Sequence, residues 1–302
     1  MPNVLFTGGS GLLALNWAYC LKDTWTVFLG LHRRKIYPSF ATVLDLDLCS
    51  EFKQLCDQLV RHKIDLVVNT VGLTDVDYCE ANPQSAHQIN CVLAERVAAA
   101  CEALSIKLIH ISSDQLFDGD SRYYLESSIP SPLNVYGKTK YQAEIEVGRV
   151  APSALILRTN FYCWGTAYRQ SYSDYLLRSV RTKAFVEVPS DIYFTPMLVS
   201  ELVEVVNGLL SHGCYGVYNV SSDVRLSKYE FARLLVSHLG GPVTRLKPVL
   251  SSQLGVRAPR PLDMSLCNTK ASMVIGRPIG DVSHQLSFLS RQANVHKELS
   301  CL

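Results

Sequence analysis

Apolar residues recur along the first half of the chain in short runs that alternate with longer helical patterns. Six runs are apolar on both faces and are predicted to be strands: Asn3–Thr7, Thr26–Leu31, Thr42–Leu46, Leu66–Asn69, Lys107–Ser112 and Ala154–Arg158. Helical patterns such as Ala86–Leu104 and Lys138–Gly148 lie between them. Strands without a polar face are typical of parallel sheets that helices cover on both sides. The pattern therefore predicts an α/β fold with a Rossmann-type, doubly wound parallel sheet.

The pattern changes near residue 160. Residues 211–223 form a short strand-rich stretch, and Leu226–Leu239 is a helical pattern in which Ser227 and Glu230 have the spacing of a capping box. We expect residues 1–160 to form the sheet domain. Residues 161–302 are expected to return in part to the sheet and otherwise to form a smaller C-terminal lobe. A ligand is expected in the cleft between the two parts.

Composition excludes several classes of protein. Of 302 residues 48% are hydrophobic, and 29 basic residues face 27 acidic ones, a balance unlike that of a nucleic-acid-binding protein. No apolar run reaches the ~18 residues of a membrane span. The N-terminus lacks the basic and apolar regions of a secretory signal. Ten cysteines without a C-x-x-C pair predict reduced thiols, no metal site and a cytoplasmic protein.

A glycine-rich turn follows the first predicted strand. Gly8 permits a tight turn, Gly11 lets the backbone approach a diphosphate, and the small Ala14 lets the following helix pack on the sheet. The free N–H groups at the start of that helix are suited to a phosphate. We therefore predict a dinucleotide site that also includes Ser10 and Leu12.

The end of the second strand indicates which dinucleotide is bound. NAD sites usually carry an acid there, whereas this strand runs into His32-Arg33-Arg34-Lys35. A guanidinium can bind a 2′-phosphate through two hydrogen bonds. We predict NADPH, with NADH as the alternative, Arg33 as the main contact and His32 either stacked or exposed. A merely solvated basic loop is the competing interpretation.

Two further loops are predicted to contact the same cofactor. Asp47 and Leu48 follow the third strand and suit an adenine pocket, although Asp47 is equally suited to cap a helix with Ser50. The fourth strand ends in small residues that let a ribose and a nicotinamide lie close, namely Thr70, Val71 and Gly72.

Tyr136 and Lys140 carry the strongest chemical signal. They are spaced i,i+4, which places them on one face of a helix. A nearby ammonium lowers the pKa of a phenol from ~10 and makes it a better acid or base. Ser113, at the end of the preceding strand, is placed to polarise the same substrate oxygen. We predict that Ser113, Tyr136 and Lys140 form a catalytic set, and that Lys140 also contacts the nicotinamide ribose.

These residues stand in longer motifs that resemble one family. The chain resembles an extended short-chain dehydrogenase/reductase, specifically the dTDP-4-dehydrorhamnose reductase (RmlD) family, over essentially its full length. The segments that carry the resemblance are Gly8–Gly11, Asn69–Asp77, Asn82-Pro83, Ile89-Asn90, Ile111–Gly119, Pro132–Lys140, Leu157–Asn160, Thr195-Pro196 and Ala258–Pro261.

The resemblance implies reduction of a 4-keto group on a nucleotide-linked deoxysugar. Tyr136 would give the proton. Thr74 and Val76 match positions that line the sugar pocket, Asn90 matches an asparagine that supports the active site and the cofactor, and Arg260 lies in a segment that closes over the substrate. A guanidinium at that place suits a diphosphate.

Three positions depart from the family pattern. Ser113 stands where the family usually has threonine, and its hydroxyl can still donate. Gln115 stands where the family has an aromatic residue and where related dehydratases have a glutamate that acts as the catalytic base. An amide cannot remove a proton, so Gln115 argues against a dehydratase. Phe161 replaces a tryptophan in the sugar pocket, which leaves the sugar open. Two other functions also stay open because their families share the motifs: a regulatory β subunit of methionine adenosyltransferase, and a nucleotide-sugar epimerase. Oligomeric state is open too, with a homodimer the commonest arrangement.

Overall fold

A computed structural model describes residues 1–255 and 257–302. Its centre is a seven-stranded parallel sheet in the order β11-β6-β5-β4-β1-β2-β3. The strands are β1 Asn3–Thr7, β2 Thr26–Leu31, β3 Thr42–Asp45, β4 Leu66–Asn69, β5 Lys107–Ile111, β6 Leu155–Arg158 and β11 Gly216–Asn219. The chain order reverses beside β1, so the carboxyl ends of β1 and β4 flank a crevice. The predicted α/β Rossmann-type fold is confirmed.

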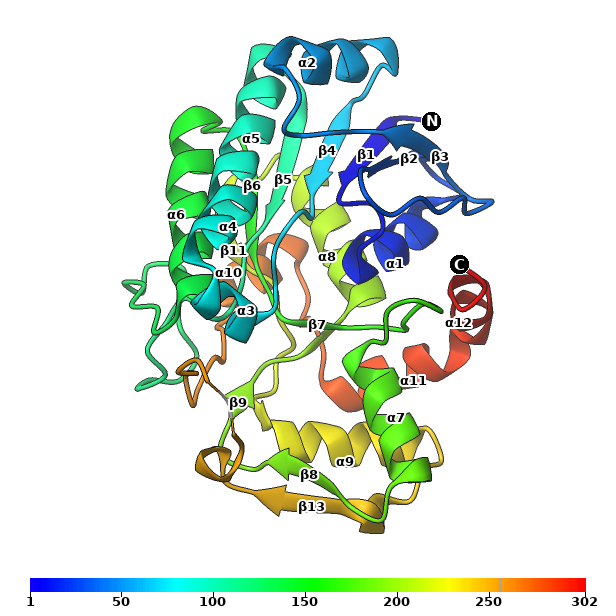
Figure 1. Cartoon of the computed structure of the whole chain (residues 1–302), viewed down its shortest axis with the longest axis vertical. Helices are drawn as coiled ribbons and strands as arrows, with labels where there is room; N and C mark the ends of the chain where they lie inside the picture. The colour runs from blue at the N-terminus through cyan, green and yellow to red at the C-terminus, as the bar shows by residue number, and fades with distance from the viewer. Residues whose placement is uncertain (256) are drawn as a thin grey trace.

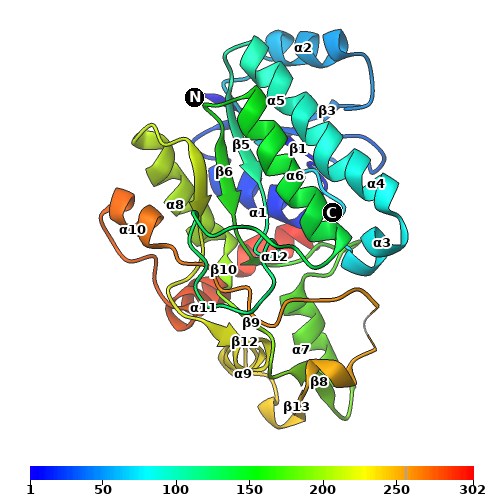
Figure 2. The same cartoon turned by 90° about the vertical axis from the view of Figure 1, so that its left-hand side faces the viewer.

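Helices cover both faces of this sheet (Figure 1). On one face α1 (Leu12–Leu21) packs against α8 (Val199–Ser211). Their buried side chains form one apolar core with the sheet, with Trp17 and Val206 among its members. On the other face lie α2 (Phe52–Arg61), α5 (Leu93–Ala103) and α6 (Val135–Val150) (Figure 2). The six predicted strands are all present because burial on both faces gives continuous apolar runs.

The predicted helix over Ala86–Leu104 is interrupted. The structure has α3 (Val76–Ala81), α4 (Pro83–His87), a π-helical turn η1 (Gln88–Val92) and then α5. The π turn inserts an extra residue and turns Asn90 fully inward. Such turns often occur at functional sites.

The C-terminal part builds a second, smaller layer below the sheet (Figure 1). Its helices are α7 Tyr172–Thr182, α9 Lys228–His238, α11 Val282–Arg291 and α12 Ala293–Leu299, with 3₁₀ turns η2 Val243–Arg245 and η3 Ser251–Gln253. Short strand pairs connect them: β7 Phe161–Tyr162 with β10 Met197–Leu198, β9 Tyr193–Phe194 with β12 Leu226–Ser227, and β8 Val186–Pro189 with β13 Leu246–Val249. Leu176, Phe231 and Leu286 lie in its apolar core. The remaining C-terminal helix, α10 (Thr269–Ile275), packs against α8 and β11 of the sheet.

The predicted capping box at the start of α9 is confirmed. Ser227 Oγ accepts from the backbone N–H of Glu230, and the Glu230 carboxylate accepts from the N–H of Ser227. The domain boundary near residue 160 stays a prediction, because α8 and β11 come later in the chain and lie with the sheet. Within the described ranges, no helix has the length and apolar character needed to cross a bilayer.

Candidate functional site

A cavity of about 630 Å³ lies at the carboxyl ends of the sheet strands. Loops after β1, β2, β3, β4, β5 and β6 all contribute to it, as does the first turn of α6. It brings together sixteen of the predicted site residues: Gly8, Ser10, Gly11, Leu12, His32, Arg33, Asp47, Leu48, Thr70, Val71, Gly72, Thr74, Ser113, Tyr136, Lys140 and Phe161.

The turn after β1 leaves the start of α1 open for an anion. Gly8 has φ +67°, a conformation that side chains rarely adopt, and a Cβ there would lie 3.1 Å from a Val71 methyl group. Gly11 is the N-cap of α1, with no side-chain cap and no acid in the first turn. The first N–H groups of the helix are therefore free to donate to a ligand, and the positive end of the helix dipole faces it. These features fit a dinucleotide diphosphate.

Basic residues line the other end of the cavity. Arg34 stacks over the Tyr168 ring at 4.3 Å, and His32 Nε2 lies 3.8 Å from Asp47 Oδ1. Arg33 is exposed and makes no ion pair with any residue the structure describes, so its guanidinium is the one left for a 2′-phosphate. Asp47 Oδ1 accepts from the N–H of Cys49, whereas the N-cap of α2 is Glu51, so the helix-cap alternative for Asp47 is wrong.

The catalytic candidates converge because α6 begins at the cavity wall. The N-cap of this helix is Asn134, whose Oδ1 accepts from the N–H of Gly137 at 2.8 Å. Tyr136 therefore lies in the first turn, with Lys140 one turn later. The ammonium of Lys140 donates to the Ile111 carbonyl oxygen at 2.6 Å, which holds the helix against the end of β5.

Burial controls the protonation of this group. It raises the pKa of Tyr136 to about 12; the Ser113 hydroxyl acts in the opposite direction and the Asp114 charge adds to the rise. Burial also lowers the pKa of Lys140 to about 8. The expected lowering of the Tyr136 pKa by Lys140 is not seen: loss of hydration dominates, and Lys140 is not among the groups that shift this pKa. Near neutral pH Tyr136 is a neutral phenol, the form that gives a proton.

Three predicted residues, Asn90, Val76 and Arg260, do not line the cavity. Asn90 Nδ2 donates to the Leu73 carbonyl and to Thr139 Oγ1, and its Oδ1 accepts from the Leu73 N–H at 2.7 Å. It thus ties the loop after β4 to α6. Val76 packs in a cluster with Tyr136. Arg260 forms an ion pair with Asp77 at 3.2 Å, which fixes its segment to α3.

Sequence reasoning missed several residues of the cavity. Asn160 Nδ2 donates to Asp114 Oδ2 at 2.7 Å, and both residues line the wall next to Ser113. Burial raises the pKa of Asp114 to about 6, although the positive charge of Lys228 opposes the rise. Asn160 and Asp114 stood inside recognised motifs, whereas no sequence pattern indicated Lys228.

A loop of the C-terminal part also reaches the phosphate turn. The Tyr168 hydroxyl donates to the Ser10 carbonyl at 2.8 Å, and Arg169 lines the cavity. No local pattern predicts this, because the loop follows β7, far from the glycine turn in sequence.

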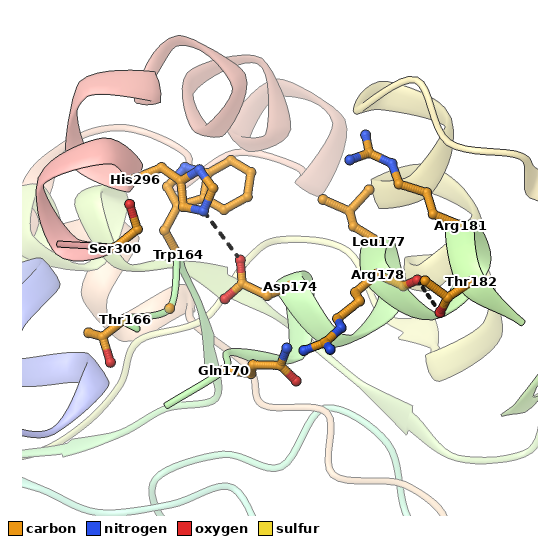
Figure 3. A pocket seen from close by; sticks show the side chains of 11 residues that line it. Trp164, Thr166, Gln170, Asp174, Leu177, Arg178, Arg181, Thr182, His296 and Ser300 are labelled. Atoms are coloured by element: carbon orange, nitrogen blue, oxygen red, sulfur yellow. Dashed lines mark hydrogen bonds and ion pairs between the residues drawn. The ribbon is translucent and has the colours of Figure 1, made fainter. Parts of the chain in front are cut away.

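A second cavity of about 380 Å³ lies between α7 and α12 and shares no lining residue with the first. Figure 3 shows the Asp174 carboxylate directed at His296, 3.8 Å away, and the His296 ring stacked on Trp164. Asp174 also accepts from Ser171 in a capping box. The carboxylate and the imidazole of this second cavity are thus already paired with each other, so we assign the catalytic chemistry to the larger cavity.

Comparison with known proteins gives a consistent result. A family model described as the RmlD substrate binding domain matches residues 2–292. The dTDP-4-dehydrorhamnose reductase of Mycobacterium tuberculosis is 30% identical over 68% of each chain. Methionine adenosyltransferase 2 subunit beta of Xenopus laevis is 27% identical over 90% of this chain and 83% of its own. A Bacillus anthracis dTDP-4-dehydrorhamnose reductase solved in complex with NADP has a TM-score of 0.84 at 25% identity, covering 97% of this chain and all of its own.

Proposed function

The chain belongs to the RmlD substrate-binding domain family, and from that premise we propose that it is an NADPH-dependent reductase of a nucleotide-linked 4-keto-deoxysugar. The observation that carries the proposal is the meeting of three features in one cavity. These are a dinucleotide turn, a free Arg33 at its far end and the set Ser113, Tyr136 and Lys140. The intact set Ser113, Tyr136 and Lys140 favours an enzyme over a protein that only binds a nucleotide.

The fit of the loops indicates how the cofactor is held. The N–H groups of Ser10 and Leu12 bind the diphosphate, since those of Gly9 and Gly11 already donate to backbone carbonyls, and Arg33 binds the 2′-phosphate. Thr70, Val71 and Gly72 make room for the ribose and the nicotinamide, and Lys140 contacts that ribose. When bound, a reduced nicotinamide supplies the hydride for the keto carbon.

The side chains of this protein supply the proton and the orientation. Tyr136, protonated near neutral pH, donates its phenolic proton to the former keto oxygen. Ser113 orients that oxygen through its hydroxyl. Lys140, one helical turn from the phenol, is assigned to the nicotinamide ribose and is held against the Ile111 carbonyl. Phe161 and Thr74 form the wall beside the sugar.

The test is oxidation of NADPH in the presence of a dTDP-linked 4-keto-6-deoxysugar. We expect turnover by the wild type and a fall of ~10²-fold or more in Tyr136→Phe, the usual contribution of one general acid, with the Kd for NADPH nearly unchanged. Tyr141→Phe, on the same helix, is the control and should keep the wild-type rate. Full activity of Tyr136→Phe would remove the phenol from the mechanism.

A second candidate rests on the relative that covers the larger share of this chain. This second candidate function is that of a non-catalytic regulatory subunit of the methionine adenosyltransferase type. It is favoured because methionine adenosyltransferase 2 subunit beta is matched over 90% of this chain. Tight NADPH binding, no turnover of any keto-sugar and co-purification with a synthetase would favour it over the reductase. Retained cofactor with isomer exchange and no net oxidation would instead indicate an epimerase.

A further inference from the structure

The loop that joins β7 to α7, residues 163–171, lies against α1 (Figure 1). Two hydrogen bonds tie it to that helix and to the turn before it. Asn16 Nδ2 on α1 donates to the Trp164 carbonyl at 2.9 Å, and the Tyr168 hydroxyl donates to the Ser10 carbonyl at 2.8 Å. Asn16 is 4% exposed, and a buried amide costs free energy unless it is hydrogen-bonded. The β7–α7 loop is therefore packed as a fixed neighbour of the dinucleotide site.

The conformation of this loop around Tyr168 is closely determined. The Thr166 N–H donates to the Arg169 carbonyl at 2.9 Å, and Thr166 Oγ1 accepts from the Arg169 N–H at 3.1 Å, so backbone and side chain close the same turn. A Cβ at Gly165 would lie 2.7 Å from the Ser171 backbone nitrogen, which leaves no room for a side chain there. Tyr168 thus projects from a tightly packed turn.

The Tyr168 hydroxyl holds one particular peptide of the phosphate turn. It bonds the carbonyl of Ser10, and the N–H of that same peptide, which belongs to Gly11, donates to the Gly8 carbonyl at 2.8 Å. The peptide is therefore fixed at both its oxygen and its nitrogen. The N–H groups of Ser10 and Leu12, which we assign to the diphosphate, belong to the peptides immediately before and after it. Their directions depend on how this central peptide is held.

The ring of Tyr168 is held in turn by the loop after β2. The Arg34 guanidinium lies over the ring at 4.3 Å from its centroid, and Arg34 itself lines the cavity. A cation is attracted to the face of an aromatic ring, so the stack stabilises the orientation in which the hydroxyl meets Ser10. Tyr168 does not line the cavity, so it acts on a ligand only through the residues that it holds.

We propose that Tyr168 is a positioning residue that pre-organises the phosphate turn for the diphosphate of the dinucleotide. The inference rests on the cofactor site proposed above and does not require that the protein reduce a keto-sugar. Donors that are fixed before binding give a higher affinity, because the ligand does not have to order them. The diphosphate is common to NADPH and NADH, so the hydroxyl raises the affinity for both alike, in contrast to Arg33, which distinguishes them.

The experiment measures the Kd of NADPH and of NADH by fluorescence titration for the wild type and for Tyr168→Phe, which removes the hydroxyl and keeps the ring over Arg34. We expect both Kd values to rise by the same factor, about 3–10-fold, the effect of one neutral hydrogen bond. In the NADPH oxidation assay the KM for NADPH should rise in parallel while kcat stays at the wild-type value. Tyr175→Phe, which alters an exposed tyrosine on α7, is the matched control and should bind both cofactors as the wild type does.

The titrations separate this inference from the proposed function. Unchanged Kd values in Tyr168→Phe, with or without a loss of stability towards urea, would overturn it, because the hydroxyl would then have a structural role alone. A rise in Kd confined to NADPH would also overturn it, since the hydroxyl would not act through the diphosphate. A wild type that binds neither dinucleotide would refute this inference and the cofactor site together. A wild type that binds both but reduces no keto-sugar would refute the reductase function, and the two Kd ratios would still decide the role of Tyr168.

Discussion

Replacing Lys140 by methionine tests the electrostatics of the site through protein stability. The side chain is 4% exposed, and burial lowers its pKa from 10.5 to about 8. Lysine is charged when it is protonated, and burial disfavours that form. Protonated Lys140 therefore destabilises the folded protein at low pH. The unfolded chain holds the proton more tightly, so stability rises with pH between about 8 and 10.5.

The magnitude follows from the two pKa values. At about 1.36 kcal/mol per tenfold change, the charged Lys140 costs about 3 kcal/mol at pH 7 and about 1 kcal/mol at pH 10. The free energy of unfolding of the wild type, relative to Lys140→Met, should therefore rise by roughly 2 kcal/mol between these pH values.

The assay is urea unfolding of both proteins at pH 7 and pH 10, followed by far-UV circular dichroism. Lys138→Met, which removes an exposed lysine from the same helix, is the control and should run parallel to the wild type. A difference between wild type and Lys140→Met that stays constant with pH would refute the argument that burial governs this ammonium.

Two further predictions concern the cofactor and the wall of the site. Arg33→Ala should raise the Kd for NADPH by about 10–100-fold and that for NADH by less than about threefold, because a charged hydrogen bond is worth about 1.5–3 kcal/mol. The measurement is a fluorescence titration with each cofactor. Arg34→Ala, which loses the contact with Tyr168, is the control and should weaken the binding of NADPH and NADH equally. If Arg33→Ala also weakened the binding of both cofactors equally, Arg33 would be excluded as the 2′-phosphate contact. Gly137→Ala should destabilise the fold by about 1–3 kcal/mol and reduce turnover, since its Cβ would clash with the Gln115 carbonyl and lie 2.9 Å from Pro132 Cβ. Gly148→Ala on the same helix has 3.9 Å of clearance and should be neutral or stabilising in thermal melts; similar destabilisation in both variants would contradict the packing argument.

The sequence pattern was most informative where local chemistry decides the structure. β1, β2 and β4 begin and end at the predicted residues, because strands buried on both faces have no polar positions to obscure them. The tight turn at Gly8 and the helix that carries Tyr136 and Lys140 could also be predicted, since each depends only on local structure.

Tertiary contacts account for what the sequence did not reveal. The π turn at Gln88–Val92 has the same apolar pattern as a regular helix. The pKa of Tyr136 depends on burial by distant elements, which the i,i+4 lysine does not offset. The pairing of Arg260 with Asp77 joins residues 183 positions apart, so spacing along the chain carries no trace of it.

The position of β11 has a consequence for how this protein is made. β6 pairs with β5 on one side and on the other only with β11, which the ribosome delivers after the strands and helices of residues 161–215. Until then a nascent chain carries an unpaired strand whose four residues are all buried in the finished molecule. Such an open edge is a template for association with other chains, so a chain halted within this interval should aggregate more readily than one that has passed β11.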